Sequence, residues 1–470
     1  MLAGIATILA IKLYLLLFVV DLTVGIYSFF TSFILFNIFF ISFTRYKDPY
    51  FDAKDIDLSN GNRPLVSMVV PVKNEEGNIR NCVQSCINST YSNKEIIIVN
   101  DGSNDSTPQI LDEMKKEEPL LKIIHLSKSV GKKQAIEAAC EIAKGDIFLF
   151  MDSDCDIASD AVERAVKIFL SDRKIGAVTG HARVRGAAEG NVLVKVQDVW
   201  FDGQFRLLKG METNFSSLTC CSGSLSIFRS AAVKPYIHAW AHDKFLGIED
   251  FKFATDRRLT AYVLGEPFPV LPNDDKNQHL SRSGGEGSNS NFNIPILLQT
   301  GKDDLDTMKS SSDPDINSSK KNPRYAWRLV YSYSVRATAG VPETFTGLLK
   351  QQIRWRKSFI RSIFATGGIY WRRPFWPAFL YYLQISLKLL RPLVIMKALI
   401  FLPLTGDFAT TALYIIGALY SGMFYGIDVR LRNPGYPFWI YRPIMTFVST
   451  FIFSWLVIYA AITIKKTGWR

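Results

Sequence analysis

Long apolar stretches at both ends of the chain constrain its fold more than any other feature. Residues 1–44 contain only two charged side chains, Lys12 and Asp21, and residues 376–464 are again dominated by Phe, Leu, Ile, Tyr and Trp. A helix needs about 20 apolar residues to cross a bilayer, so both ends predict membrane segments. The sequence between them has the composition of a globular domain.

We expect two N-terminal spans, at about residues 2–20 and 23–43, with one span and a surface-lying helix as the alternative. The apolar stretch is too long for a secretory signal peptide and lacks its basic leader. Three further apolar segments, at about 377–403, 408–427 and 437–464, predict C-terminal membrane segments, of which one can be re-entrant. A short basic tail, 465–470, ends the chain.

Basic residues flank these segments on one side. Arg45 and Lys47 follow the N-terminal stretch, and more precede the C-terminal ones, namely Arg354, Arg356, Lys357, Arg361, Arg372 and Arg373. The positive-inside rule then places residues 45–375 in the cytoplasm of a multi-pass protein of the cell membrane. The net charge of +12 suits contact with anionic membrane lipid. The alternative adds a basic tunnel for phosphates or an acidic polymer. The basic residues form no nucleic-acid-binding module, and no obligate protein partner is evident.

Short apolar strands alternate with helices between residues 62 and 270. Strands are expected at Val66–Pro71, Glu95–Asn100, Leu121–Leu126 and Ile147–Met151, and helices at Asn78–Asn88, Thr107–Lys116 and Gly131–Ala143. This alternation predicts an α/β domain with a mostly parallel sheet. Ligands of such sheets bind at the carboxyl ends of the strands, where Pro71, Asp101 and Asp152 fall.

Two later segments and the cysteines complete the organisation. Residues 272–324 are rich in Ser, Asn, Asp and Gly and predict a largely disordered insertion. In residues 325–375, the stretch Thr344–Tyr370 is amphipathic and basic, which predicts a helix along the inner membrane face. The six cysteines form no CxxC pair and have no His at metal spacing, so we expect reduced, buried thiols.

Asp152 and Asp154, two positions apart after an apolar strand, predict a divalent-metal site. Hard oxygen ligands suit Mg²⁺ or Mn²⁺, and such an ion neutralises a leaving diphosphate. Asp101 follows the strand Glu95–Asn100 and is placed to accept hydrogen bonds from a nucleotide base or ribose. Lys132 opens a helix, which is a place where anions bind. The alternatives are an Asp-rich turn, a capping turn and a surface lysine.

Asp256, in ATDRRLT, is a candidate general base. Glycosyl transfer needs a group that takes the proton from an acceptor hydroxyl, and a carboxylate near the donor sugar does so. Glu249 and Asp250 are rival candidates, and an Asp–Arg pair on a helix surface is the structural alternative.

The segment QQIRW places Gln351 and Arg354 on one helical face, with Trp355 adjacent. An Arg side chain forks onto phosphate, and a Trp face stacks on a sugar ring. A basic interfacial helix without a ligand is the alternative.

Taken in this order, these residues resemble the processive family 2 glycosyltransferases of the GT-A fold, and most closely the hyaluronan synthases. The D, DxD, (E/D)D and QxxRW motifs of that family are matched at Asp101, Asp152 with Asp154, Asp256, and Gln351 with Arg354 and Trp355. Longer matches are SGSLSIFR at 222–229, FLG…TDRRLT at 245–260, QQIRWRKS at 351–358 and the ending KKTGWR. The resemblance covers most of 62–470 except the insertion.

The resemblance implies a membrane polysaccharide synthase that uses UDP-sugars with Mn²⁺ or Mg²⁺, inverts the transferred sugar, and passes the polymer through its own membrane part. It implies that the metal is bound by Asp152 and Asp154, and that Asp256 is the base. Gln351, Arg354 and Trp355 would gate the donor and bind the acceptor, whose pocket includes Ser222 and Gly223. The UDP-sugar donor would be bound by Pro71, Asn74, Glu75, Asp101, Lys132 and Asp152. UDP-GlcNAc and UDP-GlcA are the expected donors. The alternatives are a chitin- or cellulose-like homopolymer synthase and a non-processive transferase acting on a lipid-linked acceptor.

Three departures from the family pattern leave the sugars open. Lys73 stands where many relatives carry an aromatic residue, Ser224 replaces a proline, and Thr255 replaces the first acidic residue before Asp256. A channel or scaffold with an inactive transferase domain would show losses at the acidic motifs, and these are intact.

Overall fold

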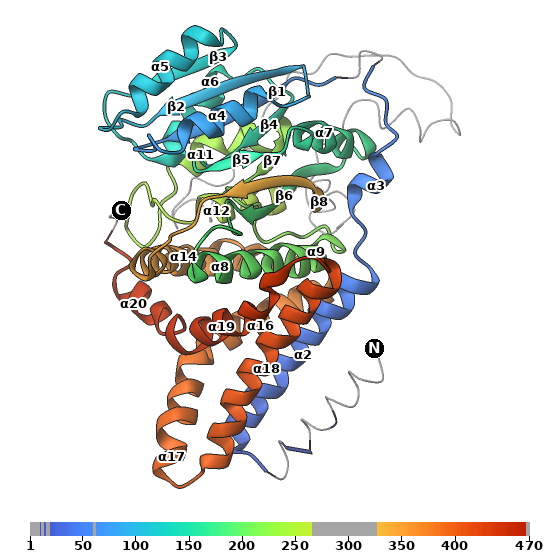
Figure 1. Cartoon of the computed structure of the whole chain (residues 1–470), viewed down its shortest axis with the longest axis vertical. Coiled ribbons are helices and arrows are strands. Elements are labelled where there is room, and N and C mark those ends of the chain that lie inside the picture. Colours follow the sequence, from blue (N-terminus) through green and yellow to red (C-terminus); the bar gives the residue numbers. More distant parts are fainter. Residues whose placement is uncertain (1–9, 11–13, 16–18, 60–62, 266–326, 467–470) are drawn as a thin grey trace, which may run out of the picture. The chain divides into compact units, whose positions relative to one another are not determined.

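The globular part is built on an eight-stranded sheet with the strand order β3-β2-β1-β4-β7-β6-β8-β5 (Figure 1). The strands are β1 (Val66–Val72), β2 (Lys94–Asn100), β3 (Leu121–His125), β4 (Ile147–Phe150), β5 (Cys155–Ile157), β6 (Ile175–Val184), β7 (Ser226–Arg229) and β8 (Arg328–Ala339). This computed structural model describes residues 10, 14–15, 19–59, 63–265 and 327–466. The expected insertion at 272–324 lies outside the described residues.

Strands β3, β2, β1 and β4 are parallel, and Val66 of β1 pairs with Lys94 of β2 and Ile147 of β4. All seven residues of β1 are buried, as expected for a strand that is covered on both faces. The second half is mixed: β7 is antiparallel to β4 and β6, β8 is parallel to β6, and β5 is antiparallel to β8. The prediction of an α/β fold with a mostly parallel sheet is therefore confirmed.

The three expected helices are α4 (Ile79–Ile87), α5 (Thr107–Glu117) and α6 (Lys132–Ile142). Helix α6 packs on β1 and β2. The remaining helices of the globular part are α3 (Pro49–Ala53), α7 (Ala161–Ser171), α8 (Val192–Gly203), the π-helix η1 (Gln204–Lys209), α9 (Gly210–Thr213), α10 (Ser230–Val233), η2 (Lys234–Tyr236), α11 (Ile237–Ala241) and α12 (Thr255–Gly265). Helices α8 and α14 (Phe345–Ala365) lie between the sheet and the long apolar helices (Figure 1).

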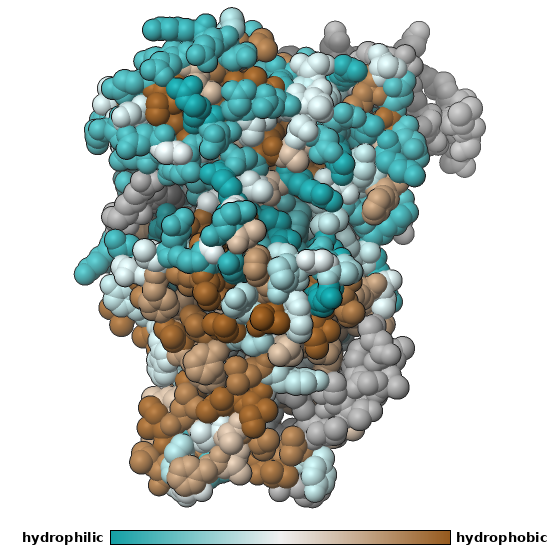
Figure 2. Space-filling model, in the orientation of Figure 1, coloured by the Kyte–Doolittle hydropathy of each residue, from teal (hydrophilic) through white to brown (hydrophobic). Residues whose placement is uncertain are grey.

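The apolar ends form a separate set of helices: α2 (Leu22–Thr44), α15 (Gly367–Tyr370), α16 (Phe375–Met396), η7 (Lys397–Phe401), α17 (Leu402–Leu404), α18 (Phe408–Arg432), η8 (Pro437–Tyr441), α19 (Arg442–Phe447), η9 (Val448–Ile452) and α20 (Leu456–Ile462). Helix α2 packs against α16 and α18. Exposed apolar side chains gather over these helices, whereas polar ones cover the sheet (Figure 2).

Among the described residues, two helices are long and apolar enough to cross a membrane, Leu22–Ala53 and Phe408–Arg432. A third span results if the bent pair Pro437–Ile452 and Leu456–Ile462 is counted as one. The expected segment at 377–403 is helical but is not among these candidate spans. Most of the first expected span, 2–20, lies outside the described residues.

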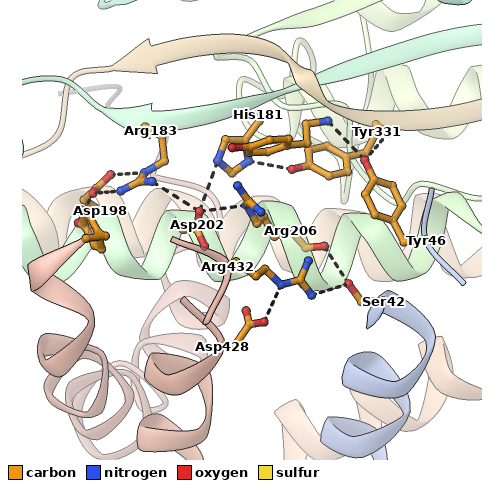
Figure 3. Close-up of polar contacts among 12 residues, drawn as sticks. Ser42, Tyr46, His181, Arg183, Asp198, Asp202, Arg206, Tyr331, Asp428 and Arg432 are labelled. Carbon is orange, nitrogen blue, oxygen red and sulfur yellow. Dashed lines mark hydrogen bonds and ion pairs between the residues drawn. The ribbon is translucent and has the colours of Figure 1, made fainter. Parts of the chain in front are cut away.

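A buried polar network joins the sheet to the apolar helices (Figure 3). Arg183 of β6 donates two hydrogen bonds to Asp198 of α8, at 2.8 and 2.5 Å. The Asp202 carboxylate, also on α8, lies 3.4–3.6 Å from side-chain nitrogens of His181, Arg183 and Arg206. Below it, Ser42 of α2 donates to the carbonyl of Arg206 at 3.1 Å. The network therefore connects the globular part to α2 through side chains and backbone.

Candidate active site

One cavity of about 1320 Å³ collects residues from all the acidic and aromatic motifs. Of the predicted site residues, its lining includes Pro71, Glu75, Asp101, Lys132, Asp152, Asp154, Ser222, Gly223, Asp256, Gln351, Arg354 and Trp355. Asn74, which we predicted to bind the UDP-sugar donor, does not line the cavity. The Asn74 side-chain carbonyl instead accepts from the Asn104 amide at 2.8 Å, and the Asn74 amide donates to the Ser103 hydroxyl at 2.9 Å. Asn74 thus holds together two loops beside the cavity.

Lys132 lies between two of the predicted carboxylates. Its ammonium donates to Asp152 at 2.5 Å and lies 3.5 Å from Asp256. Burial alone would lower the pKa of the Lys132 amine, but the charges of Asp152 and Asp256 outweigh it and raise that pKa above its ordinary value. Lys132 is therefore a fixed cation at the first residue of α6, where a helix also favours an anion.

Gly223 brings the two carboxylates close to each other. Its amide donates to Asp256 at 2.9 Å, and its carbonyl accepts from the Asp152 amide at 2.9 Å. A Cβ at this position would lie 2.7 Å from Asp152 Oδ2, 2.9 Å from Asp256 Oδ2 and 3.1 Å from Lys132 Nζ. A larger side chain at this position would therefore displace the charged groups of Asp152, Asp256 and Lys132.

The Asp154 carboxyl is affected by a second negative charge close to it. Burial, followed by the neighbouring Asp152 charge, raises the pKa of the Asp154 carboxyl to about 6. The Asp152 and Asp154 carboxylates repel each other, and a bound divalent cation would relieve this repulsion. The oxygen donors of Asp152 and Asp154 fit a hard divalent ion such as Mn²⁺ or Mg²⁺.

Asp101 holds the loop that leads into α6. Its carboxylate accepts from the Ser129 hydroxyl at 2.8 Å, the Val130 amide at 2.6 Å and the Gly131 amide at 3.0 Å. Gly131 has a φ of +104°, a conformation that favours glycine. Asp101 therefore positions Lys132 through this loop while it also lines the cavity.

The two rival carboxylates have other partners. Glu249 is exposed and pairs with Lys244 at 2.8 Å. Asp250 lines the cavity but its carboxylate accepts from His242 at 3.1 Å. Asp256, by contrast, contacts Lys132 and the Gly223 amide between the other predicted residues.

Trp355 belongs to an aromatic group that sequence reasoning missed. The indole of Trp355 on α14 is 37% exposed, and its ring centroid lies 5.5 Å from Trp200 and 6.3 Å from Phe201, both on α8. All three line the cavity. Trp200 and Phe201 occur in an apolar helical stretch, which carries no local signal of a site.

Asp243 was also missed, and it ties three site elements together. Its buried carboxylate accepts from Arg361 of α14 at 2.7 and 3.0 Å and from Arg258 of α12 at 3.1 Å, and lies 3.9 Å from the Lys133 ammonium of α6. Burial alone would raise the pKa of Asp243, but these cations, Arg361 foremost, hold it below its ordinary value. The elements bearing Lys132, Asp256 and Arg354 are thus joined at one ionised carboxylate.

Residues 67–236 match the family model "Glycosyl transferase family 2". The chain carries a family 2 glycosyltransferase domain. It is 25% identical to hyaluronan synthase of Streptococcus pyogenes over 413 residues, which cover 86% of this chain and 82% of that protein. It is 29% identical to poly-beta-1,6-N-acetyl-D-glucosamine synthase of Staphylococcus epidermidis over 169 residues, or 36% of this chain and 40% of that protein.

Among solved structures, the chain is similar to mannosyltransferase PcManGT from Pyrobaculum calidifontis in complex with GDP-Man and Mn²⁺. The TM-score is 0.48 at 18% identity, and the match covers 92% of this chain and 98% of the other. The glycosyltransferase prediction is confirmed by the match of the family 2 domain.

Proposed function

We propose that this chain is a processive membrane polysaccharide synthase, which transfers sugars from UDP donors with inversion and conducts the growing polymer through its own helices. One observation carries the proposal: a single cavity runs from the acidic motifs, past Trp355, to residues of α2, α16 and α18. A non-processive transferase needs no such continuation. The similarity to two polysaccharide synthases supports the same conclusion.

The donor end of the cavity provides the groups that a UDP-sugar needs. Asp101 and the strand end at Pro71 would face the nucleoside, and the Lys132 cation would contact the diphosphate. Asp152 and Asp154 would hold Mn²⁺ or Mg²⁺. The bound ion would neutralise the charge that develops on the leaving UDP.

Asp256 is the proposed general base. As the acceptor hydroxyl forms a bond to the anomeric carbon, the bond from that carbon to the diphosphate breaks on the opposite face, which inverts the configuration. The hydroxyl proton passes to Asp256. Trp355 would stack on the acceptor sugar, Ser222 and Gly223 would line its pocket, and Gln351 with Arg354 would close over the donor.

The membrane end of the cavity favours an acidic polymer. Its cationic lining residues include Arg257, Arg356, Lys388, Arg391 and Arg442. Among the described residues of α14, α16, α18 and α19, no acidic side chain lines the cavity. One acid from α9, Glu212, faces this region and accepts from Thr219 at 2.7 Å.

These cations lie close enough to affect one another. Burial, and then the Arg391 and Arg257 charges, lowers the pKa of Arg356 to about 10. Charges inside a membrane protein are costly unless they serve a ligand or a pathway. A polymer with a carboxylate on alternate sugars would neutralise them, which favours UDP-GlcNAc and UDP-GlcA as donors over a neutral homopolymer.

The proposal includes a cytoplasmic catalytic domain in a multi-pass protein of the cell membrane, since the donors are cytosolic nucleotide sugars. Basic residues at both membrane junctions support this orientation.

The test is incorporation of sugar by membranes that contain the chain, incubated with Mn²⁺ and with UDP-GlcNAc, UDP-GlcA or UDP-Glc, singly and in pairs. Long product that requires both GlcNAc and GlcA is expected. Polymer from one donor would replace the proposal with a homopolymer synthase. A single-sugar adduct would show a non-processive transferase.

A further inference from the structure

Two histidines and a glutamate, none of which lines the cavity, converge on the surface of the globular part. His238 on α11 and His242, just after it, are one helical turn apart, and both face Glu137 of α6. His238 Nδ1 lies 2.7 Å from Glu137 Oε1, and His242 Nε2 lies 3.2 Å from Glu137 Oε2. The three ligand atoms all lie within 4.8 Å of one another.

We propose that Glu137, His238 and His242 bind a Zn²⁺ ion, with water as a fourth ligand. Imidazole nitrogen and carboxylate oxygen are the ligand types of zinc sites that keep one open position. The ligand atoms are close enough for small rotations of the side chains to bring them to bonding distance. The His238 side chain is 74% exposed, so an ion has access.

Asp250 adds an observation that a simple ion pair does not require. It accepts from His242 Nδ1 at 3.1 Å, on the opposite side of the ring from the nitrogen that faces Glu137. A proton held at Nδ1 by Asp250 leaves the lone pair of Nε2 available for a metal. Carboxylates orient metal-binding histidines in this way. The group therefore has three ligands and the partner that fixes the tautomer of one of them.

A second His–carboxylate pair on the surface provides a comparison. His125 lies 3.2 Å from Asp112, and no second histidine or further carboxylate joins it in a ligand group among the described residues. That pair is an ordinary surface contact, whereas the Glu137 group gathers ligands from two helices.

A bound ion would restrain two elements that lead into the active site. Helix α6 begins at Lys132 and contains Glu137, and the segment after His242 leads to Asp256 at the start of α12. That segment contains three non-glycine residues with positive φ, namely Leu246, Asp250 and Ala254, a conformation costly for side chains other than glycine. The ion would tie the end of α11, from which this segment starts, to α6. The inference does not depend on the identity of the polymer.

The test is Zn²⁺ binding to the purified full-length chain, stripped with EDTA and dialysed against Zn²⁺ in the absence of nucleotide. His238→Gln, His242→Gln and Glu137→Gln are each expected to weaken one zinc site at least tenfold, and Asp250→Asn about tenfold. His125→Gln is the matched control and should bind as the unmodified chain does.

Cobalt substitution identifies the ligands. Co²⁺ bound by nitrogen and oxygen gives visible d–d bands without the near-ultraviolet charge-transfer band of thiolate, and His238→Gln should remove them. Binding that persists in the His238→Gln, His242→Gln double variant, or a thiolate band from the six cysteines, would overturn the proposal. Absence of binding by the unmodified chain would also overturn it.

Discussion

Asp256 owes its position to two neighbours, the Gly223 amide at 2.9 Å and the Lys132 ammonium at 3.5 Å. Both contacts direct its carboxylate into the cavity, where a general base would meet the acceptor hydroxyl. An asparagine at this position could keep only some of these contacts, because its amide has a single accepting oxygen. It also cannot take up a proton as a carboxylate does.

We therefore expect Asp256→Asn to lower the rate of elongation by about 10²–10⁴-fold while UDP affinity changes little. Radiolabelled sugar incorporation and UDP binding by calorimetry measure the two effects. Glu249→Gln is the control, since Glu249 is an exposed acid of the same segment. Near-normal elongation by the Asp256 variant would remove this residue from the mechanism.

Asp154 gives a pH dependence whose direction follows from its surroundings. Because burial and the Asp152 charge raise its pKa to about 6, the metal-free site holds a proton below that pH. Binding of Mn²⁺ must release this proton. We expect Mn²⁺ affinity to be constant above about pH 6 and to fall by up to about tenfold per pH unit below it. Asp154→Asn should bind Mn²⁺ weakly and without this dependence, and a flat profile for the unmodified chain would contradict the assignment.

Helices α6, α12 and α14 keep a common geometry because of a single buried carboxylate. Asp243 accepts from Arg361 and Arg258 and lies near Lys133. Each of these cations is within two turns of a proposed site residue on its own helix. The arrangement ties together the helices that carry these proposed residues, and Asp243 itself does not line the cavity.

Asp243→Asn is expected to lower the stability of the globular part by about 3–5 kcal/mol, since it leaves buried cations without a charged partner. The midpoint of thermal unfolding measures this loss. Asp112→Asn provides the control because the Asp112 carboxylate is exposed and forms its ion pair with His125. Equal midpoints for the two variants would mean that Asp243 does not bind these helices together.

These elements also show what a sequence can predict. β1, β2 and β4 are buried apolar runs, so the positions of Pro71, Asp101 and Asp152 at or just after strand ends could be predicted from the sequence alone. The pairing of β5 with β8 joins residues such as Asp156 and Thr338, which no local pattern links. Asp243 and Trp200 escaped notice for the same reason: their roles arise from contacts between distant segments.

At the scale of the whole molecule, the active site and the apolar helices are held together by the network between β6, α8, α2 and α18 (Figure 3). Arg432 of α18 donates to Asp428 at 2.7 Å and to Ser42 of α2 at 3.4 Å. Polar contacts of this kind are directional, so they fix the position of the globular part over the helices. The cavity can then continue from one to the other.

Lys388 and Arg391 of α16 test whether that continuation conducts an acidic polymer. Replacing both with glutamine removes two cations from the cavity lining but leaves the donor end intact. We expect the rate of UDP release in the first turnover to stay within about twofold of the rate of the unmodified chain, since the transfer chemistry is unchanged. Product length, measured by gel filtration, should fall several-fold, because a charged polymer would leave the site sooner when fewer cations attract it.

Lys397→Gln is the matched control for these substitutions. Lys397 continues the same helical segment but pairs with Asp21 at 2.9 Å and does not line the cavity. Its loss should leave product length unchanged. Polymer of normal length from the Lys388→Gln, Arg391→Gln variant would show that these two cations are not needed for translocation. Together with growth on a single neutral donor, it would favour a homopolymer synthase, for which a cationic passage has no use.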